Sequence, residues 1–218
     1  METSAWPGVF RRGRDLYTAN LVPGRRVYGE DLREEGGVEY RQWDPWRSKL
    51  AAYLLKSPAP GLLSRARKVL YLGGAHGTTV SHLSDMLPAA EIYVIEKSAA
   101  SFAPLLALAR ERPNVLPILA DAQLPERYAA DVGTVDFLYQ DVAQRTQPAI
   151  FRENATTCLH AEGEGLLMLK VRSVTQSRPT RAVLAEARRE LEGAALRVGD
   201  SADLAPFSRD HVALRLSK

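Results

Sequence analysis

The stretch "YLGGAHGTTVSHLSD", residues 71–85, decides the fold, because it runs from an apolar segment through glycines into a helical pattern. It predicts a strand over 68–74 and a helix over 76–87. Glycines between a strand and a helix let the backbone approach a ligand closely, and the start of the helix offers free amide groups. "GGAHGTT" is not a strict G-x-G-x-x-G, so the turn predicts a ligand site without identifying the ligand.

Strands and helices alternate along the chain from this point onward. Two final strands have no helix between them and are therefore expected to form an antiparallel hairpin. Alternation of this kind predicts an α/β fold with a Rossmann-like, seven-stranded, mostly parallel sheet covered by helices on both faces. The remaining strands are expected over 91–97, 115–121, 135–142, 165–173, 195–204 and 210–218, and the helices over 98–112, 147–159 and 181–191.

The first part of the chain has a different pattern, made of short extended pieces separated by turn residues such as Pro23-Gly24 and Gly36-Gly37. This pattern predicts a small antiparallel β domain over residues 1–44, followed by the α/β domain over 45–218.

A helix is expected where the second domain begins, over residues 44–56. Asp44 is a suitable N-cap, with Pro45 at the first helical position. Lys49 lies in this helix, whose apolar face contains Leu50, Leu54 and Leu55.

Composition limits the class of protein. The chain has 218 residues, of which 45% are hydrophobic, enough for one sizeable core. Its single cysteine, Cys158, excludes an intrachain disulfide and a multi-thiolate zinc site. The sequence contains no apolar run of the roughly 20 residues that a membrane helix needs, and no signal peptide is recognisable. We therefore expect a soluble cytoplasmic protein that has no membrane partner and no metal.

Charge is distributed unevenly along the chain. Residues 1–68 hold 13 Lys and Arg against 8 Asp and Glu, whereas residues 69–218 hold 16 against 18. A phosphate backbone attracts positive charge of this kind, although ordinary surface arginines would give the same count.

Three successive strands of the predicted sheet end in a carboxylate: Glu96, Asp121 and Asp141. The carboxyl ends of parallel strands are where such sheets bind ligands, so these side chains should surround the glycine turn at Gly73, Gly74 and Gly77. Glu96 lies about 20 residues beyond the glycines, where an acceptor for ribose hydroxyls belongs. Three carboxylates suit a cationic sulfonium nucleoside better than a pyrophosphate.

Several long motifs also carry a family resemblance. "NLVPGRRVYGE", "YRQWDPWRSKLAA", "VLYLGGAHGTTVSHLSD", "RPNVLPILADAQ", "YQDVAQ" and "RDHVAL" resemble the archaeal fibrillarin family, ribose 2′-O-methyltransferases of box C/D RNA-guided ribonucleoproteins. The resemblance extends from about residue 15 to the last residue. It implies the class I S-adenosylmethionine-dependent methyltransferase fold, and an archaeal form without a glycine- and arginine-rich extension. The implied partners are a Nop-domain scaffold protein, a kink-turn-binding ribosomal-type protein, box C/D guide RNA and an rRNA or tRNA substrate.

The family's residues carry over by motif. The resemblance implies a catalytic set of Lys49, Asp141, Lys170 and His211. Because methyl transfer to a 2′-hydroxyl requires removal of its proton, we assign Lys170 as the base, with Asp141 orienting it and His211 orienting the reacting group or relaying a proton. Lys49 would hold the ribose or a phosphate. Glu96 would accept the ribose hydroxyls of S-adenosylmethionine, Asp121 and Ala122 would face its adenine, and the Asp141 loop would lie near its methionine end. The implied cofactor residues are Gly73, Thr78, Thr79, Glu96, Lys97, Asp121, Ala122, Asp141, Val142, Ala143 and Gln144.

Two other functions use parts of the same pattern. A nicotinamide-dependent oxidoreductase would use the same glycine turn, but 218 residues leave no room for a separate substrate domain. A noncatalytic ribonucleoprotein subunit would be expected to have lost some of the four catalytic residues, and all four are present. Trp43 and Trp46 could stack on RNA or pack between the two domains.

Overall fold

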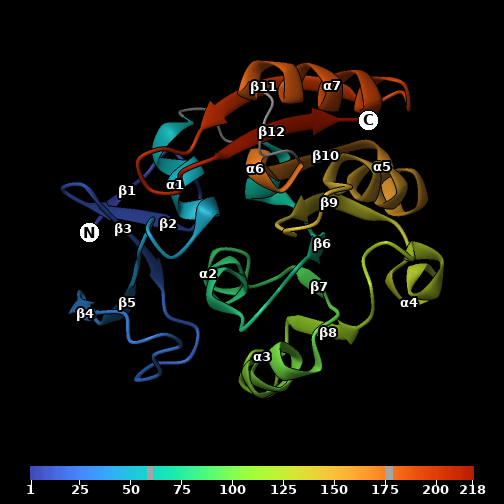
Figure 1. Ribbon diagram of the computed structural model, residues 1–218. Helices are drawn as coiled ribbons and strands as arrows, with labels where there is room; N and C mark the ends of the chain where they lie inside the picture. Colours follow the sequence, from blue (N-terminus) through green and yellow to red (C-terminus); the bar gives the residue numbers. More distant parts are fainter. Residues whose placement is uncertain (58–60, 175–178) are drawn as a thin grey trace.

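In the computed structural model, which describes residues 1–57, 61–174 and 179–218, the chain forms two β-sheets (Figure 1). The N-terminal sheet is antiparallel, as its alternating short strands and glycine turns require. Gly36 and Gly37 both have positive φ in the two-residue turn of its last hairpin. In spatial order its strands are β1 (Glu2–Thr3), β2 (Val9–Arg12), β3 (Asp15–Ala19), β5 (Val38–Trp43) and β4 (Leu32–Glu35).

The second sheet has seven strands, five of them parallel, and ends in an antiparallel hairpin. The predicted Rossmann-like methyltransferase fold is therefore confirmed. Strand β6 lies between β9 and β7, where the strand order reverses, and is the middle one of the five strands that pair in parallel. In spatial order the strands are β11 (Arg197–Asp203), β12 (His211–Ser217), β10 (Leu159–Lys170), β9 (Val135–Gln140), β6 (Lys68–Leu72), β7 (Glu91–Glu96) and β8 (Val115–Leu119).

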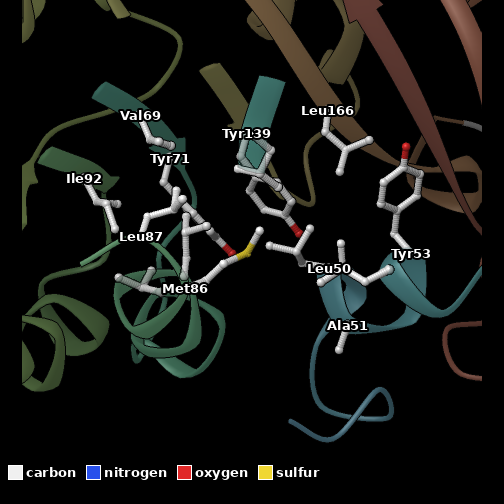
Figure 2. Packing of buried hydrophobic residues seen from close by; sticks show 14 of the residues in the cluster. Leu50, Ala51, Tyr53, Val69, Tyr71, Met86, Leu87, Ile92, Tyr139 and Leu166 are labelled. Atoms are coloured by element: carbon white, nitrogen blue, oxygen red, sulfur yellow. The ribbon is translucent and has the colours of Figure 1, made fainter. Parts of the chain in front are cut away.

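Alternate residues of the central strands pack into two separate apolar clusters, one on each face of the sheet. Val69 and Tyr71 of β6 enter the first cluster, and Leu70 and Leu72 enter the second. The first cluster also contains side chains of α1 (Lys49–Lys56), α2 (Thr78–Met86), α3 (Ala99–Glu111) and the N-terminal sheet, as Figure 2 shows in part. The second cluster contains side chains of α4 (Ala129–Val132), α5 (Gln147–Cys158) and α7 (Thr180–Glu192).

Helix α1 begins later than expected, so the prediction of Asp44 as N-cap and Pro45 as first helical residue is wrong. The N-cap is Ser48, whose hydroxyl accepts a hydrogen bond from the Ala51 amide at 3.3 Å. Asp44 instead closes a turn, because its Oδ1 accepts from the Trp46 amide at 2.8 Å. Lys49 is consequently the first residue of the helix.

Strand β10 runs over Leu159–Lys170 and does not continue to residue 173 as expected. Its pairing with β12 ends at Lys170 opposite His211, and the Val171 amide then donates to the Asp210 carbonyl. Residues Val171–Val174 form the short helix α6 in place of a strand end.

A buried ionic network joins the N-terminal sheet to α2 and the end of α3. Arg41 of β5 donates to Asp85 of α2 at 2.7 Å and to Glu30 at 2.7 Å, and Arg112 donates to the other oxygen of Asp85. All four side chains are at most 1% exposed. Charges this deeply buried are tolerated only when each one is paired and hydrogen-bonded.

Replacing Asp85 with alanine should lower the free energy of unfolding by about 3–5 kcal/mol, because two buried guanidinium groups lose their shared partner. The measurement is urea denaturation. The matched control is Asp200→Ala on the exposed side of β11, which should change stability by less than about 0.5 kcal/mol. Equal losses for the two variants would contradict a structural role for the network.

Candidate functional site

A cleft of about 330 Å³ lies at the carboxyl ends of β6, β7 and β9, where the topology predicts a ligand site. Its wall also includes Ala75, Ile95 and Ala120, which no sequence motif singled out. Eight of the predicted cofactor residues line it: Gly73, Glu96, Lys97, Ala122, Asp141, Val142, Ala143 and Gln144.

Glu96 is held in place by two backbone amides. Its Oε2 accepts from Ala75 in the glycine turn at 2.9 Å, and its Oε1 accepts from Ser98 at 2.7 Å. A carboxylate oxygen can accept more than one hydrogen bond, so each oxygen retains capacity for a ligand donor. A fixed bidentate acceptor of this kind suits a pair of vicinal hydroxyl groups.

Gly73 allows the turn after β6 to pass directly beside the loop after β9. Its φ of +88° disfavours any side chain, and a Cβ at this position would lie 2.5 Å from the Asp141 carbonyl oxygen. The Gly73 amide donates to Ile95, and the Asp141 amide donates to Leu72. The three strand ends are thereby held against one another.

Thr78, Thr79 and Asp121 are predicted cofactor residues, but they are not part of the cleft wall that the described residues form. Thr79 is buried, and its hydroxyl donates to the Ser48 hydroxyl at 3.0 Å instead of facing the cleft. Thr78 begins α2. Asp121 lies beside the wall residue Ala122, accepts from the Gln123 amide at 3.0 Å, and is 3.8 Å from the Lys97 ammonium.

The sequence did not predict the Thr79–Ser48 hydrogen bond, because Thr79 was expected to contact the cofactor and Ser48 had no expected role. Ser48 caps α1, whose first residue is Lys49, and Thr79 lies in the first turn of α2, directly after the glycine turn. This contact therefore connects the start of α1, where Lys49 lies, to the start of α2, which follows the glycine turn.

Of the four predicted catalytic residues, Asp141 lines the cleft and the other three are grouped near it. Lys49 Nζ donates to Asp141 Oδ2 at 2.7 Å, whereas Asp141 was expected to orient Lys170. Lys170 and His211 are paired across β10 and β12. The pKa of His211 is below its ordinary value, mainly because of burial and then because of the positive charge of Lys49. Lys170 lowers it further, whereas Asp141 opposes the shift, so all three charges act on this ring.

A second, more polar cleft continues from the first one at Ala143, which lines both. Lys170, Arg145 and Arg172 contribute positive charge to it, and Arg172 forms an exposed ion pair with Asp210 at 3.0 Å. The two arginines were not predicted, although each follows closely after a strand-end motif. A basic groove beside the four-residue cluster suits a phosphate-bearing chain.

No group of three or more His, Cys, Asp or Glu side chains is placed to hold a metal ion among residues 1–57, 61–174 and 179–218. No helix in these ranges is long and apolar enough to cross a membrane.

Comparison with known proteins gives one consistent family. The fibrillarin family model matches residues 2–217. The fibrillarin-like rRNA/tRNA 2′-O-methyltransferase of Methanothermobacter thermautotrophicus is 40% identical over 217 residues, covering 100% of this chain and 97% of the relative.

Solved structures agree with this result. Aeropyrum pernix fibrillarin, in complex with natively bound S-adenosyl-L-methionine, is 40% identical, with a TM-score of 0.89 over 99% of this chain and 96% of that one. A fibrillarin in a complex with Nop5p is 37% identical, with a TM-score of 0.87 over 99% of both chains.

Gly73→Ala should destabilise the protein more than Gly29→Ala, which serves as its matched control. Both positions have nearly the same positive φ, +88° and +86°, but a Cβ at Gly29 meets nothing within 4 Å. We expect about 1–2 kcal/mol for the conformational strain shared by both variants, and about 1–3 kcal/mol more for the clash at Gly73. Urea denaturation measures the difference. Equal losses would show that the loop after β9 can move away without cost.

The pKa of His211, followed by NMR of its ring protons, should lie below 6.5 and respond oppositely to two substitutions. Lys49→Met should raise it by removing a positive charge, and Asp141→Asn should lower it by removing a negative one. Because the unfolded chain binds this proton more readily, His211 also lowers stability as the pH falls from 6.5 through the folded pKa. Shifts in the same direction would contradict the proposed cluster.

Proposed function

This chain belongs to the fibrillarin family, and on that premise we propose that it transfers a methyl group from S-adenosylmethionine to the 2′-hydroxyl of rRNA and tRNA nucleotides. The observation that carries the proposal is the joining of two sites: the cleft that contains Glu96 and Asp141 shares Ala143 with the basic cleft that contains Lys170, and Asp141 is paired with Lys49. The donor and the RNA would thus meet at the catalytic cluster.

The residues of the cleft fit the proposed cofactor. Glu96, fixed by two amides, would accept both ribose hydroxyls, and small residues such as Ala122 leave space for the flat adenine. The carboxylates of Glu96 and Asp141 favour a cation. When bound, S-adenosylmethionine would supply a methyl group attached to a positively charged sulfur. Loss of that methyl group leaves a neutral thioether, so no negative charge that would need a metal builds up on the leaving group.

The protein must then remove a proton from a weakly acidic hydroxyl as the new C–O bond forms. We assign this role to Lys170, whose ammonium has no ion-pair partner among residues 1–57, 61–174 and 179–218 and which lies in the basic cleft. In its uncharged form this amine would take the proton. Lys49, held by Asp141, would position the ribose or its phosphate. His211, buried and with a lowered pKa, would act as a neutral hydrogen-bonding group that orients the acceptor.

The proposed assembly is a box C/D ribonucleoprotein in which guide RNA selects the nucleotide by base pairing. The fibrillarin of the Nop5p complex supports a Nop-domain scaffold partner. We further propose a kink-turn-binding ribosomal-type protein, a box C/D guide RNA, and the cytoplasm as the site of action. Because the guide RNA would select the target, this chain would need to recognise only the RNA backbone and one ribose, consistent with its net charge of only +3.

Reconstitution with these partners should give methylation at one nucleotide, and a single 2′-deoxy substitution at that nucleotide should abolish it. Lys170→Met should slow single-turnover methylation by about 10²–10⁴-fold and leave S-adenosylmethionine binding, measured by calorimetry, unchanged. Glu96→Gln should weaken that binding instead.

The matched control is Lys68→Met, which lies at the opposite end of β6 and should behave like wild type. NAD is the control ligand. Binding of NAD in place of S-adenosylmethionine would favour an oxidoreductase. Cofactor binding without methylation in the complete assembly would favour a noncatalytic subunit.

A further inference from the structure

The two neighbouring tryptophans, Trp43 and Trp46, have different environments. Trp43 is fully buried and stacks on His82, with ring centroids 4.9 Å apart and planes 11° apart. Trp46 is 62% exposed, the highest exposed fraction among the large apolar side chains of the described residues. Its only ring contact in the described chain is with Phe207, edge to face at 5.2 Å and 73°. Packing between the sheets thus accounts for Trp43 and leaves Trp46 unexplained.

Trp46 and Phe207 lie on the two segments that lead into Lys49 and His211 of the catalytic cluster. Trp46 precedes Lys49 by three residues, and Phe207 precedes His211 by four. The loop between β11 and β12, which carries Phe207, runs past α1 (Figure 1) and is tied to it by a hydrogen bond from the Lys56 ammonium to the Ala205 carbonyl. The two segments that carry the aromatic pair thus lead directly to Lys49 and His211, and His211 is paired with Lys170 of the basic cleft.

The indole is held on an ordered turn. The Trp46 amide donates to Asp44, the Arg47 amide donates to the Asp44 carbonyl at 3.1 Å, and the Arg47 guanidinium lies 5.7 Å from the centre of the Tyr28 ring. Because this turn is already ordered, the backbone at Trp46 loses little conformational freedom when a ligand stacks on the indole.

The charges around the aromatic pair favour a nucleic acid over a protein surface. Arg47 follows Trp46 directly, Arg209 lies two residues after Phe207, and both are exposed. The neighbouring carboxylates already have partners, because Asp44 accepts from the turn and Asp210 pairs with Arg172. One exposed indole with arginines close to it and to Phe207 in sequence is not a broad apolar patch of the kind that protein partners cover. It matches the combination of aromatic rings and positive charge that binds single-stranded nucleic acids.

We propose that Trp46, supported edge-on by Phe207, stacks on the base of a nucleotide next to the target ribose, while Arg47 and Arg209 hold the flanking phosphates. This inference rests on the proposed function. Stacking here would hold the RNA strand in register at the Lys49–Asp141 pair, without reading its sequence.

The test uses the reconstituted complex and Trp46→Ala, with Trp46→Phe as the conservative variant. Trp46→Ala should raise the KM for target RNA by roughly 5- to 100-fold, the effect of losing one base–aromatic stack, and Trp46→Phe should restore most of the loss. Leu106→Ala, which removes an exposed apolar side chain from α3, should have no effect. Binding of the scaffold protein and of S-adenosylmethionine should not change in any of them.

Target RNAs with an abasic site on either side of the target nucleotide identify the stacked base. One of these RNAs should raise the KM of the wild type as much as Trp46→Ala raises it with intact RNA. The same RNA should not raise the KM of Trp46→Ala any further. The proposal would be overturned if Trp46→Ala raised the KM by the same factor with intact RNA and with both abasic RNAs. It would also be overturned if Trp46→Ala weakened binding of the scaffold protein and left the KM unchanged.

Fluorescence separates this proposal from the proposed function, because it does not depend on methyl transfer. Trp6 and Trp43 are buried, so target RNA should quench the emission of wild type and not that of Trp46→Phe. Quenching without methylation would retain the stacking site and reject the activity. Equal emission with and without RNA would overturn the stacking site even in an active enzyme.

Discussion

The close approach of Gly73 to the Asp141 carbonyl is the constraint on which the rest of the site depends. Strand β6 lies between β7 and β9, so the ends of these three strands lie side by side, and only a residue without a side chain lets the turn after β6 pass against the loop after β9. Asp141 is fixed twice as a result: its main chain packs against the glycine turn, and its carboxylate pairs with Lys49. The donor cleft and the catalytic cluster share this residue.

The N-terminal sheet contributes to this arrangement through α2. Arg41 reaches across from β5 to Asp85 and also donates to the Ser81 hydroxyl, while Thr79 in the same helix donates to Ser48 at the start of α1. The start of α2, which follows the glycine turn, is thus held by side chains from two directions. The small sheet is therefore part of the framework that positions the site, although its own residues do not line the cleft in the described part of the chain.

Features that depend on strand order in sequence were predictable, and features that depend on long-range pairing were not. Glu96 and Asp141 were located because parallel strands end at one edge. The predicted start of α1 was wrong because Asp44 and Ser48 are both suitable N-caps. Asp44 closes a turn with the Trp46 amide, and Ser48 is therefore the residue that caps the helix. The Lys49–Asp141 pair joins residues 92 positions apart, which no local pattern encodes. The division into domains at residue 44 and the individual catalytic roles remain predictions.

The division of the core into two clusters restricts how such a protein can diverge. Each central strand sends successive side chains into opposite layers, so a change of volume at Tyr71 is felt among α1 and α2, and one at Leu72 is felt on the other face. The interior of the sheet is thus constrained from both sides along its whole length. New specificity can arise at low cost only where strands end and loops begin, which confines evolutionary novelty to the rim that already binds ligands.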